Sequence, residues 1–255
     1  MSESLVLVYA AVLGLSLGSF LNVCIVRLPK GESLFRPRSR CMSCGRQISW
    51  YENVPVLSWL ALRGRCGTCG SRISVQYPLV ELATGLIWVG AYYHYALSWQ
   101  ALSAALFGTL LFGIAVTDAR EYIIPDEFSV GGVVLGLALS FAPGRPAPLM
   151  SFIGAALCFA LMYGVAVVGE WAFKKPALGG GDIKMMAMVG AFLGPLYALL
   201  TIFVGSLVGA VIFGPIGLKT GKLVPFGVFL AVGAAVVLVF GEAMVGWYAT
   251  YILGL

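Results

Sequence analysis

The sequence alternates between long apolar runs and short breaks that are polar or rich in glycine and proline. A helix needs about 20 mostly apolar residues to cross a hydrocarbon core of about 30 Å, and the longer runs reach that length. Gly194-Pro195 separates two neighbouring runs and predicts a sharp turn between them. The pattern predicts an all-α polytopic membrane protein with about eight transmembrane helices, near residues 5–28, 79–97, 100–117, 128–142, 149–173, 184–194, 196–218 and 225–253.

Residues 29–77 form the only long polar stretch of the chain. This stretch contains eight Lys or Arg residues and four Cys residues. Its prolines predict turns and short strands rather than helices. We therefore expect three parts: a first transmembrane helix (1–28), a polar insert (29–77) and a membrane-embedded domain (78–255).

The composition agrees with a membrane location. Of the 255 residues, 60% are hydrophobic and 11% are charged, and the mean hydropathy is +0.95. Soluble domains average about 25% charged residues, so the chain is expected to be an integral membrane protein. The net charge of +5 does not indicate a nucleic-acid partner, because the basic residues lie in loops beside apolar runs rather than on a soluble face.

The basic residues also predict the orientation in the lipid bilayer. Glu3 precedes the first apolar run while Arg27 and Lys30 follow it, which is not the pattern of a cleavable signal peptide. Basic residues favour the cytoplasmic side, which places the N-terminus outside. In that orientation, 15 of the 16 Lys and Arg residues fall in the cytoplasmic segments 27–77, 118–127, 174–184 and 219–224.

Four cysteines of the insert have the spacing of a metal site. They form the motifs Cys41-Met-Ser-Cys44-Gly and Cys66-Gly-Thr-Cys69-Gly, separated by 21 residues. Two such pairs supply four thiolates for a tetrahedral zinc ion, as in zinc ribbons. Two disulfides are the alternative, which a cytoplasmic location disfavours. Because the protein would fill all four positions, we expect the zinc to be structural rather than catalytic.

A glycine-rich segment, Gly179-Gly-Gly181-Asp182-Ile-Lys184, interrupts the apolar pattern in the second half of the chain. Three consecutive glycines are unfavourable inside a helix, so irregular backbone is expected here, with a helix beginning after it. The apolar run that follows is too short to span the membrane, which predicts that Asp182 lies at or just inside the membrane surface. A carboxylate and irregular backbone at that depth indicate a water-filled functional site.

A second acidic cluster places Asp118 where another apolar run reaches the cytoplasmic surface. Its neighbours Glu121, Asp126 and Glu127 lie further into the loop and are interpreted individually as loop acids. Two carboxylates at equal depth on different helices can share a proton, which leaves one neutral and one ionised, as in aspartic proteases. The same pair could instead conduct protons or cations in a transporter.

These motifs together resemble those of the bacterial type IV prepilin peptidases, which are membrane-embedded aspartic proteases with a Gly-x-Gly-Asp motif. The resemblance covers nearly the whole chain. The matching segments, in order, are Gly18-Ser-Phe-Leu-Asn22-Val-Cys-Ile-Val-Arg27-Leu-Pro29, the four-Cys insert, Gln76-Tyr-Pro-Leu-Val-Glu81, Thr117-Asp118-Ala-Arg with Ile124-Pro125-Asp126, and Gly179-Gly-Gly181-Asp182-Ile-Lys184.

The resemblance implies that Asp118 and Asp182 are the catalytic pair. It implies that the substrates are type IV prepilins and the related pseudopilins of type II secretion. They would be cut on the cytoplasmic face of the bacterial inner membrane, after the Gly that ends a short basic leader. We expect nearby cytoplasmic acids to bind that leader, the candidates being Glu121, Asp126, Glu127 and Glu170.

Members of this family that carry the four-Cys insert commonly also methylate the new N-terminal amine with S-adenosylmethionine. The resemblance implies the same activity here and associates Gly64, in Leu62-Arg-Gly64-Arg-Cys66, with that step. The sequence has no Rossmann fingerprint that would point to a cofactor site independently. The expectation therefore depends on the resemblance alone.

Two other classes of function fit parts of the sequence. A proton-coupled membrane carrier could use the same two aspartates, but it predicts polar residues deep in several spans. Outside the aspartate segments, only Asn22 and Glu242 are strongly polar candidates. A non-enzymatic assembly factor could use the insert as a docking surface, and loss of cleavage on changing only Asp118 would argue against it.

Overall fold

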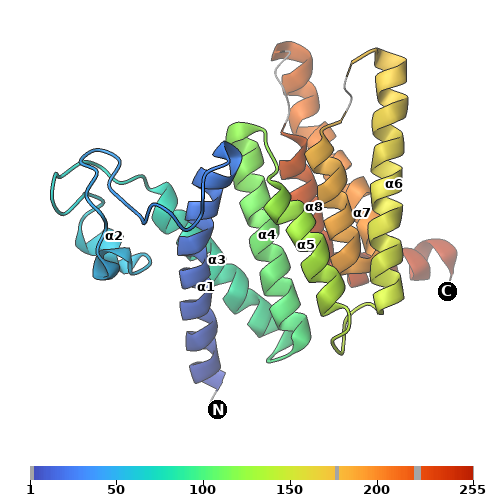
Figure 1. The fold of residues 1–255 in the computed structure, drawn as a ribbon. Helices are drawn as coiled ribbons and strands as arrows, with labels where there is room; N and C mark the ends of the chain where they lie inside the picture. The colour runs from blue at the N-terminus through green and yellow to red at the C-terminus, as the bar shows by residue number, and fades with distance from the viewer. Residues whose placement is uncertain (1–2, 176–177, 221–224, 255) are drawn as a thin grey trace. The chain divides into compact units, whose positions relative to one another are not determined.

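The computed structural model describes residues 3–175, 178–220 and 225–254 (Figure 1). All named elements in these ranges are helical, which confirms the predicted all-α class. The chain divides into two compact units, Met1–Ala105 and Leu106–Leu255, which are described separately. The α-helices are α1 (Glu3–Arg27), α2 (Leu57–Ala61), α3 (Gln76–Tyr95), α4 (Trp99–Glu121), α5 (Asp126–Leu139), α6 (Pro148–Phe173), α7 (Gly180–Thr220) and α8 (Phe226–Tyr248).

Several helices can cross a membrane, so the chain is a multi-pass membrane protein. Among the described residues, five segments are long and apolar enough to do so: Glu3–Lys30, Trp99–Glu121, Pro148–Phe173, Gly180–Ile212 and Phe226–Leu253. The sequence predicts about eight crossings, and the larger number stays a prediction, as does the division of the chain at residues 28 and 77.

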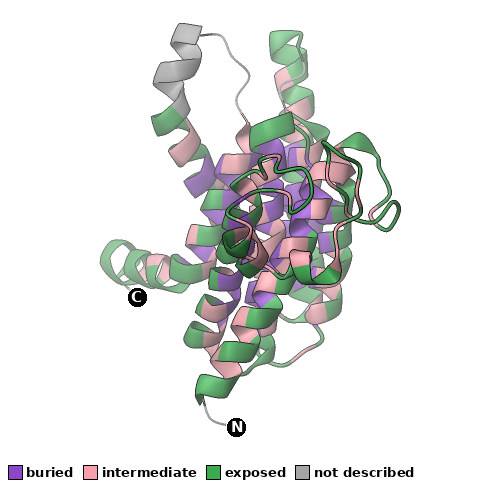
Figure 2. Ribbon diagram, turned by 90° about the vertical axis from the view of Figure 1, so that its left-hand side faces the viewer, coloured by how far each residue is buried: buried purple, intermediate pink, exposed green. Residues whose placement is uncertain are grey.

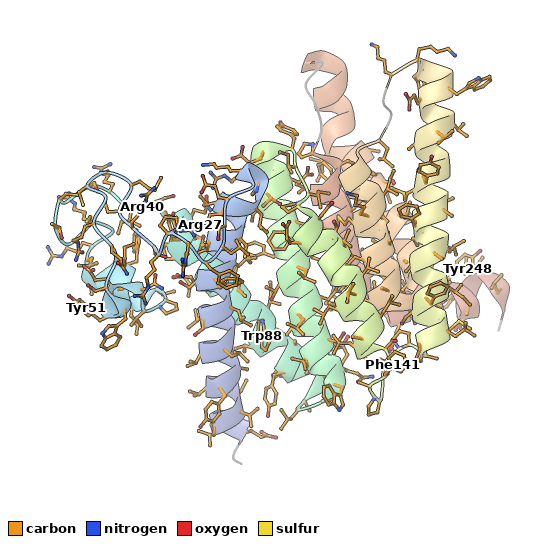
Figure 3. All side chains as sticks on the ribbon, in the orientation of Figure 1. Arg27, Arg40, Tyr51, Trp88, Phe141 and Tyr248 are labelled. Carbon is orange, nitrogen blue, oxygen red and sulfur yellow. The ribbon has the colours of Figure 1, made fainter. Side chains whose placement is uncertain are left out.

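In the first unit, α1 packs closely against α3. A Cβ atom at Gly14 would lie 2.8 Å from the Cβ of Trp88, which Figure 3 labels, and one at Gly18 would lie 2.7 Å from the Cα of Glu81. Small residues allow membrane helices to approach this closely, so that backbone and side chains are in van der Waals contact. Gly14 and Gly18 therefore form the face on which α1 packs against α3.

The insert folds as turns and short helical segments. It contains two 3-10 helices (Leu28–Lys30, at its start, and Trp50–Asn53), α2, and two isolated antiparallel β-bridges (Arg40 with Gln47, Arg65 with Arg72). The expectation of strands without helices is wrong for α2, whose Leu and Ala residues have good helix propensity. Arg27, at the end of α1, anchors the start of the insert by donating hydrogen bonds to the carbonyls of Ser33 (2.8 Å) and Pro37 (2.7 Å) (Figure 3).

In the second unit, α7 reverses its direction at Gly194, which has φ 77° and ψ 176°. Before Gly194, α7 runs parallel to α5. Gly132 of α5 packs on Met188 of α7, and one turn later in both helices Gly136 packs on Phe192. After Gly194, α7 runs antiparallel to α8, because positions later in α7 contact positions earlier in α8. The contacts are Tyr197 with Gly241, Gly205 with Leu230 and Gly209 with Phe229. Helices α5 and α8 both begin beside Ile124. The first part of α7 therefore leads away from Ile124 and the second part returns toward it, so the two parts are antiparallel. The predicted turn at Gly194-Pro195 is confirmed.

The glycine-rich segment is more regular than the sequence predicts. Helix α7 begins at Gly180, so Gly180 and Gly181 lie in its first turn with Asp182, and the expected irregular backbone does not extend over them. Each helical glycine costs about 1 kcal/mol relative to alanine. Close packing offsets that cost at Gly181, where a Cβ atom would lie 2.9 Å from the Cβ of Ile124.

The helices carry both buried and exposed residues along their length (Figure 2). In the second unit the buried side chains include Phe107, Phe192 and Leu230, whereas Phe152 and Phe203 are exposed. Exposed apolar side chains on helices of this length are expected to face lipid.

Candidate active site and metal centre

Asp118 lies in the last turn of α4 and is 6% exposed. Its Oδ2 accepts a hydrogen bond from the backbone N–H of Val228, in the first turn of α8, at 3.1 Å. The first N–H groups of a helix have no partner within the helix and carry partial positive charge. Helix α8 therefore presents its positive end to the Asp118 carboxylate.

Asp182 is the third residue of α7 and is 9% exposed. Its Oδ2 lies beside Gly179, where a Cβ atom would come within 3.0 Å of that oxygen. Its Oδ1 is buried and has no hydrogen-bond partner in the part of the chain that the structure describes. Because leaving a buried acceptor without a partner costs free energy, such an atom is a candidate for a functional role.

Ile124, in the loop between α4 and α5, brings the two aspartates together. A Cβ atom at Gly181 would lie 2.9 Å from the Ile124 Cβ, and one at Gly227 would lie 2.7 Å from the Ile124 Cδ1. A Cβ atom at Gly227 would also lie 2.9 Å from the Asp118 Oδ2. Ile124 thus contacts both the first turn of α7, which carries Asp182, and the first turn of α8, which adjoins Asp118. Both therefore lie at one place, where an end of α4 meets the starts of α7 and α8.

Gly227 and Val228 belong to this site, although the sequence does not single them out. Gly227 leaves room for Ile124 and Asp118, and Val228 donates to Asp118. The sequence feature that could have pointed to these residues is Pro225, just before α8. Prolines are common at helix starts, and the start of a helix can bind an anion.

An ion pair joins the two segments that carry the aspartates. The Nζ atom of Lys184 lies 2.6 and 2.8 Å from the two carboxylate oxygens of Asp126. Lys184 is two residues after Asp182, and Asp126 is two residues after Ile124. Both side chains are partly exposed, so the pair is expected to add only about 0.2–1 kcal/mol of stability. Asp126, a predicted leader-binding residue, therefore already has a cationic partner.

The other predicted leader-binding acids are on the surface. Glu121 ends α4, Glu127 lies in the first turn of α5, and Glu170 is near the end of α6. All three are exposed.

The four cysteines of the insert form a single cluster. One ligand atom from each of Cys41, Cys44, Cys66 and Cys69 lies within 4.8 Å of the others, and all are free thiols. The Sγ atoms of Cys41 and Cys69 are 3.8 Å apart. Tetrahedral zinc with Zn–S bonds of about 2.3 Å separates its sulfur ligands by about 3.8 Å, so this spacing fits the ion.

The two halves of the cluster have the same backbone hydrogen bonds. Each begins with a cysteine whose carbonyl accepts a 2.9 Å hydrogen bond from the glycine four residues later, Gly45 in the first half and Gly70 in the second. These glycines have φ of 72° and 68°, which glycine adopts without strain. The repeated geometry aims two pairs of thiols at one point, as a four-thiolate metal site requires.

The thiols differ in acidity. Hydrogen bonds from the Ser71 side chain and from the backbone of Cys44 and Ser43 lower the pKa of Cys41 to about 5, which favours the thiolate that binds metal. The Arg46 backbone favours the Cys44 thiolate, but desolvation and the neighbouring Cys41 and Cys69 outweigh it and raise the pKa of Cys44 to about 11. A divalent cation would supply the positive charge that four adjacent thiolates need.

Gly64 lies two residues before the second half of this cluster and is buried. Its φ is +66°, and a Cβ atom there would lie 2.8 Å from the ring of Trp59. Gly64 belongs to the first unit and the two aspartates belong to the second.

Comparison with known proteins identifies two family regions. Residues 12–95 match the family model described as the bacterial peptidase A24 N-terminal domain, and residues 105–214 match the one described as the type IV leader peptidase family. No solved structure matches the chain significantly.

Relatives named "Prepilin leader peptidase/N-methyltransferase" are similar over most of the chain. A protein of Myxococcus xanthus (strain DK1622) is 43% identical over 218 residues, which are 86% of this chain and 65% of that protein. A protein of Stutzerimonas stutzeri is 35% identical over 95% of this chain and 93% of its own length. A protein of Pseudomonas aeruginosa is 32% identical over 94% of this chain and 92% of its own length.

Proposed function

The chain belongs to the type IV prepilin leader peptidase/N-methyltransferase (peptidase A24) family, and on that basis we propose that it removes the leader of type IV prepilins and pseudopilins and methylates the new amino terminus. One observation carries the peptidase half of the proposal. Asp118 and Asp182 are both buried, and they meet where an end of α4 adjoins the starts of two helices.

The aspartate pair would hydrolyse the peptide bond as one acid–base unit. The ionised carboxylate takes a proton from water as the water oxygen attacks the carbonyl carbon, and the protonated carboxyl gives its proton to the carbonyl oxygen. When the tetrahedral intermediate collapses, the C–N bond breaks, the carboxyl that took the water proton gives it to the leaving nitrogen, and the other carboxylate takes a proton from a hydroxyl of the intermediate, which restores the pair. The shared proton belongs to the pair rather than to either residue.

The surroundings of the pair support these roles. The Val228 N–H and the start of α8 stabilise negative charge on Asp118, and the buried Asp182 Oδ1 has no hydrogen-bond partner among the described residues. That oxygen is therefore free to accept the proton that the pair shares. The Lys184–Asp126 ion pair joins the segments that neighbour the two aspartates.

The orientation in the membrane follows from the charge distribution. We place the N-terminus outside, with the insert and the aspartate pair on the cytoplasmic side of the bacterial inner membrane, because 15 of 16 basic residues then lie in the cytoplasm. Counting α3, α5 and both parts of α7 gives the eight crossings that the sequence predicts.

The leader of a prepilin is basic, so acids near the aspartate pair would attract it. Glu121, Glu127 and Glu170 are exposed and close in sequence to the ends of α4, α5 and α6. Asp126 contributes less, because Lys184 neutralises it. This attraction would be electrostatic and sensitive to salt.

Zinc fits the cysteine cluster as a structural ion. Cys41, Cys44, Cys66 and Cys69 would hold it, since their sulfur atoms converge with the spacing of a tetrahedral site. The bound ion would fold a polar insert that is too small to form a substantial core of its own.

Methylation of the new amino terminus needs a methyl donor, which we take to be S-adenosylmethionine. When bound, it supplies an electrophilic methyl group to the neutral amine. The residue that the resemblance associates with this step is Gly64, which is buried against the Trp59 ring with no room for a side chain. The unit that contains Gly64 also contains the cysteine cluster.

The carrier interpretation has less support. Family membership favours the enzyme. In addition, the Asn22 Nδ2 donates hydrogen bonds to the carbonyls of Gly18 and Tyr77, as expected for a residue that packs α1 against α3, although its buried Oδ1 has no partner among the described residues.

The proposal can be tested with purified protein in lipid vesicles. The protein receives a full-length prepilin and S-adenosylmethionine, and the products are measured by mass spectrometry. Loss of the leader followed by addition of one methyl group to the new amino terminus is expected. An uncut substrate would overturn the peptidase assignment, and a cut but unmethylated product would overturn the methyltransferase assignment.

A further inference from the structure

Glu81 is a buried carboxylate that the proposed peptidase reaction does not use. It lies in the second turn of α3 and is 7% exposed. Its Oε2 accepts a 2.8 Å hydrogen bond from the backbone N–H of Val56, in the insert, and its backbone packs against Gly18 of α1. A buried carboxylate is costly unless it is hydrogen-bonded, so this arrangement ties the insert to two helices of the first unit.

The residue that Glu81 holds has a strained backbone. Val56 has φ 62° and ψ −50°, a conformation that a β-branched residue rarely adopts. Such residues persist only where the surrounding structure fixes them. Val56 is also the N-cap of α2, so the Glu81 hydrogen bond determines where α2 begins.

Three hydrogen bonds among Trp59, Gly64 and Ile73 form a ring that connects α2 to the residues after it. The Gly64 N–H donates to the Trp59 carbonyl (2.8 Å), and the Ile73 N–H donates to the Gly64 carbonyl (2.7 Å). The Trp59 indole N–H donates to the Ile73 carbonyl (3.3 Å). The Trp59 ring covers Gly64 so closely that a Cβ atom there would lie 2.8 Å away, and the φ of +66° also favours glycine.

These contacts connect α3 to Gly64 through α2. Glu81 fixes Val56 at one end of α2, and Trp59, inside α2, packs on Gly64. We propose that Glu81 is a positioning residue for methyl transfer, acting on the Gly64 loop through Val56 and Trp59. This inference rests on the proposed role of Gly64 in methylation. Glu81 would not touch the methyl donor or the amine, so its hydrogen bond, rather than its charge, is what matters.

The test compares Glu81→Ala, Glu81→Gln and a control, Thr84→Val, in full-length protein in vesicles. A glutamine oxygen can still accept the Val56 N–H, whereas alanine cannot. Thr84 is buried one turn further along α3, and among the described residues its hydroxyl bonds only within its own helix, to the Val80 carbonyl. Each variant receives a pre-cleaved pilin with S-adenosylmethionine and, separately, an intact prepilin.

Glu81→Ala should lower kcat for methylation by about tenfold or more, because small misplacements of a reacting group cost that much. Leader cleavage should change by less than about twofold, and Glu81→Gln and Thr84→Val should methylate like the wild type. Hydrogen exchange of the segment 56–64 should accelerate in Glu81→Ala only. Adding Val56→Gly to Glu81→Ala should restore part of the methylation, because glycine adopts the positive φ without strain.

Three results would overturn the inference: normal methylation by Glu81→Ala, a Glu81→Gln variant as impaired as Glu81→Ala, or equal loss of cleavage and methylation. Gly64→Ala in the same assay separates this inference from the proposed function. If Gly64→Ala methylates normally, the role of Gly64 fails, and the positioning role fails with it. If Gly64→Ala is impaired and Glu81→Ala is not, only the positioning role fails.

Discussion

Single residues around Ile124 set how closely the aspartate-bearing helices approach. Gly181 and Gly227 have no room for a Cβ atom against Ile124, whereas a Cβ atom at Gly180 would have nothing within 4 Å. Adjacent glycines of one motif therefore have different roles. Gly181 permits the contact that brings α7 to the site, and Gly180 does not.

Gly181→Ala should reduce kcat/KM for prepilin cleavage by about tenfold or more, because an alanine methyl group would push Ile124 and shift one aspartate relative to the other. Gly227→Ala should have a similar effect. The matched control is Gly180→Ala, which should stay within about twofold of the wild type, since alanine is the better helix former. Equal losses at Gly180 and Gly181 would show that the close contact with Ile124 is not what matters.

The aspartates themselves can be found in the sequence, because each stands at the end of an apolar run. Their partners cannot, since Gly227 and Val228 are distant in the chain and meet Asp118 only when α8 packs against α4. The pairing of Asp126 with Lys184 is hidden for the same reason. Local patterns identify reactive groups, but long-range packing decides what surrounds them.

At the scale of elements, the sequence predicts boundaries well where a strong signal exists. Gly194-Pro195 marks the reversal inside α7, and the paired cysteine motifs mark the cluster of the insert. The start of α7 at Gly180 is missed because helix propensity opposes it and packing on Ile124 overrides that propensity. Helix α2 is missed because five residues carry too little periodic pattern.

The insert should contain one zinc ion per chain. Cys41→Ser should lose that zinc and lower protein abundance more than the cleavage rate per folded molecule, because the ion folds the insert rather than reacting. Elemental analysis of purified protein measures the zinc, with Cys24→Ala as a control, since Cys24 is buried in α1 outside the cluster. Wild-type protein without zinc would contradict the structural assignment.

Lowering the pH should release the zinc. Its ligands are thiolates, so the bound state holds fewer protons than the free thiols, and metal-dependent stability is present at neutral pH and lost as protons compete for sulfur. A zinc-sensitive dye measures the release during acidification. Zinc retention that does not depend on pH would argue against four thiolate ligands.

At the scale of the whole molecule, charge rather than shape determines orientation and substrate attraction. Fifteen of the 16 basic residues favour one side, and the exposed acids Glu121, Glu127 and Glu170 would lie on that side. Within the described ranges, five segments reach the length and hydropathy of a membrane span. The sequence predicts more crossings because its apolar runs include α5, which is only 14 residues long.

Neutralising Glu121, Glu127 and Glu170 together to glutamine should raise KM for a basic-leader prepilin at low salt and flatten its salt dependence, because surface charges are screened by ions. A matched control is Glu242→Gln, in the second half of α8 and away from the proposed cytoplasmic face. The measurement is KM over a range of ionic strength. An unchanged KM at low salt would show that these acids do not bind the leader.

The most direct test of the account replaces the two aspartates. Asp118→Asn and Asp182→Asn preserve side-chain shape but cannot accept the proton that water must lose. Each variant should insert in the membrane and yet cleave prepilin at least about a thousandfold more slowly, with the double variant hardly worse than either single variant, because the pair acts as one unit. Both single variants should still methylate a pre-cleaved pilin. Normal cleavage by either single variant would contradict the assignment of the pair.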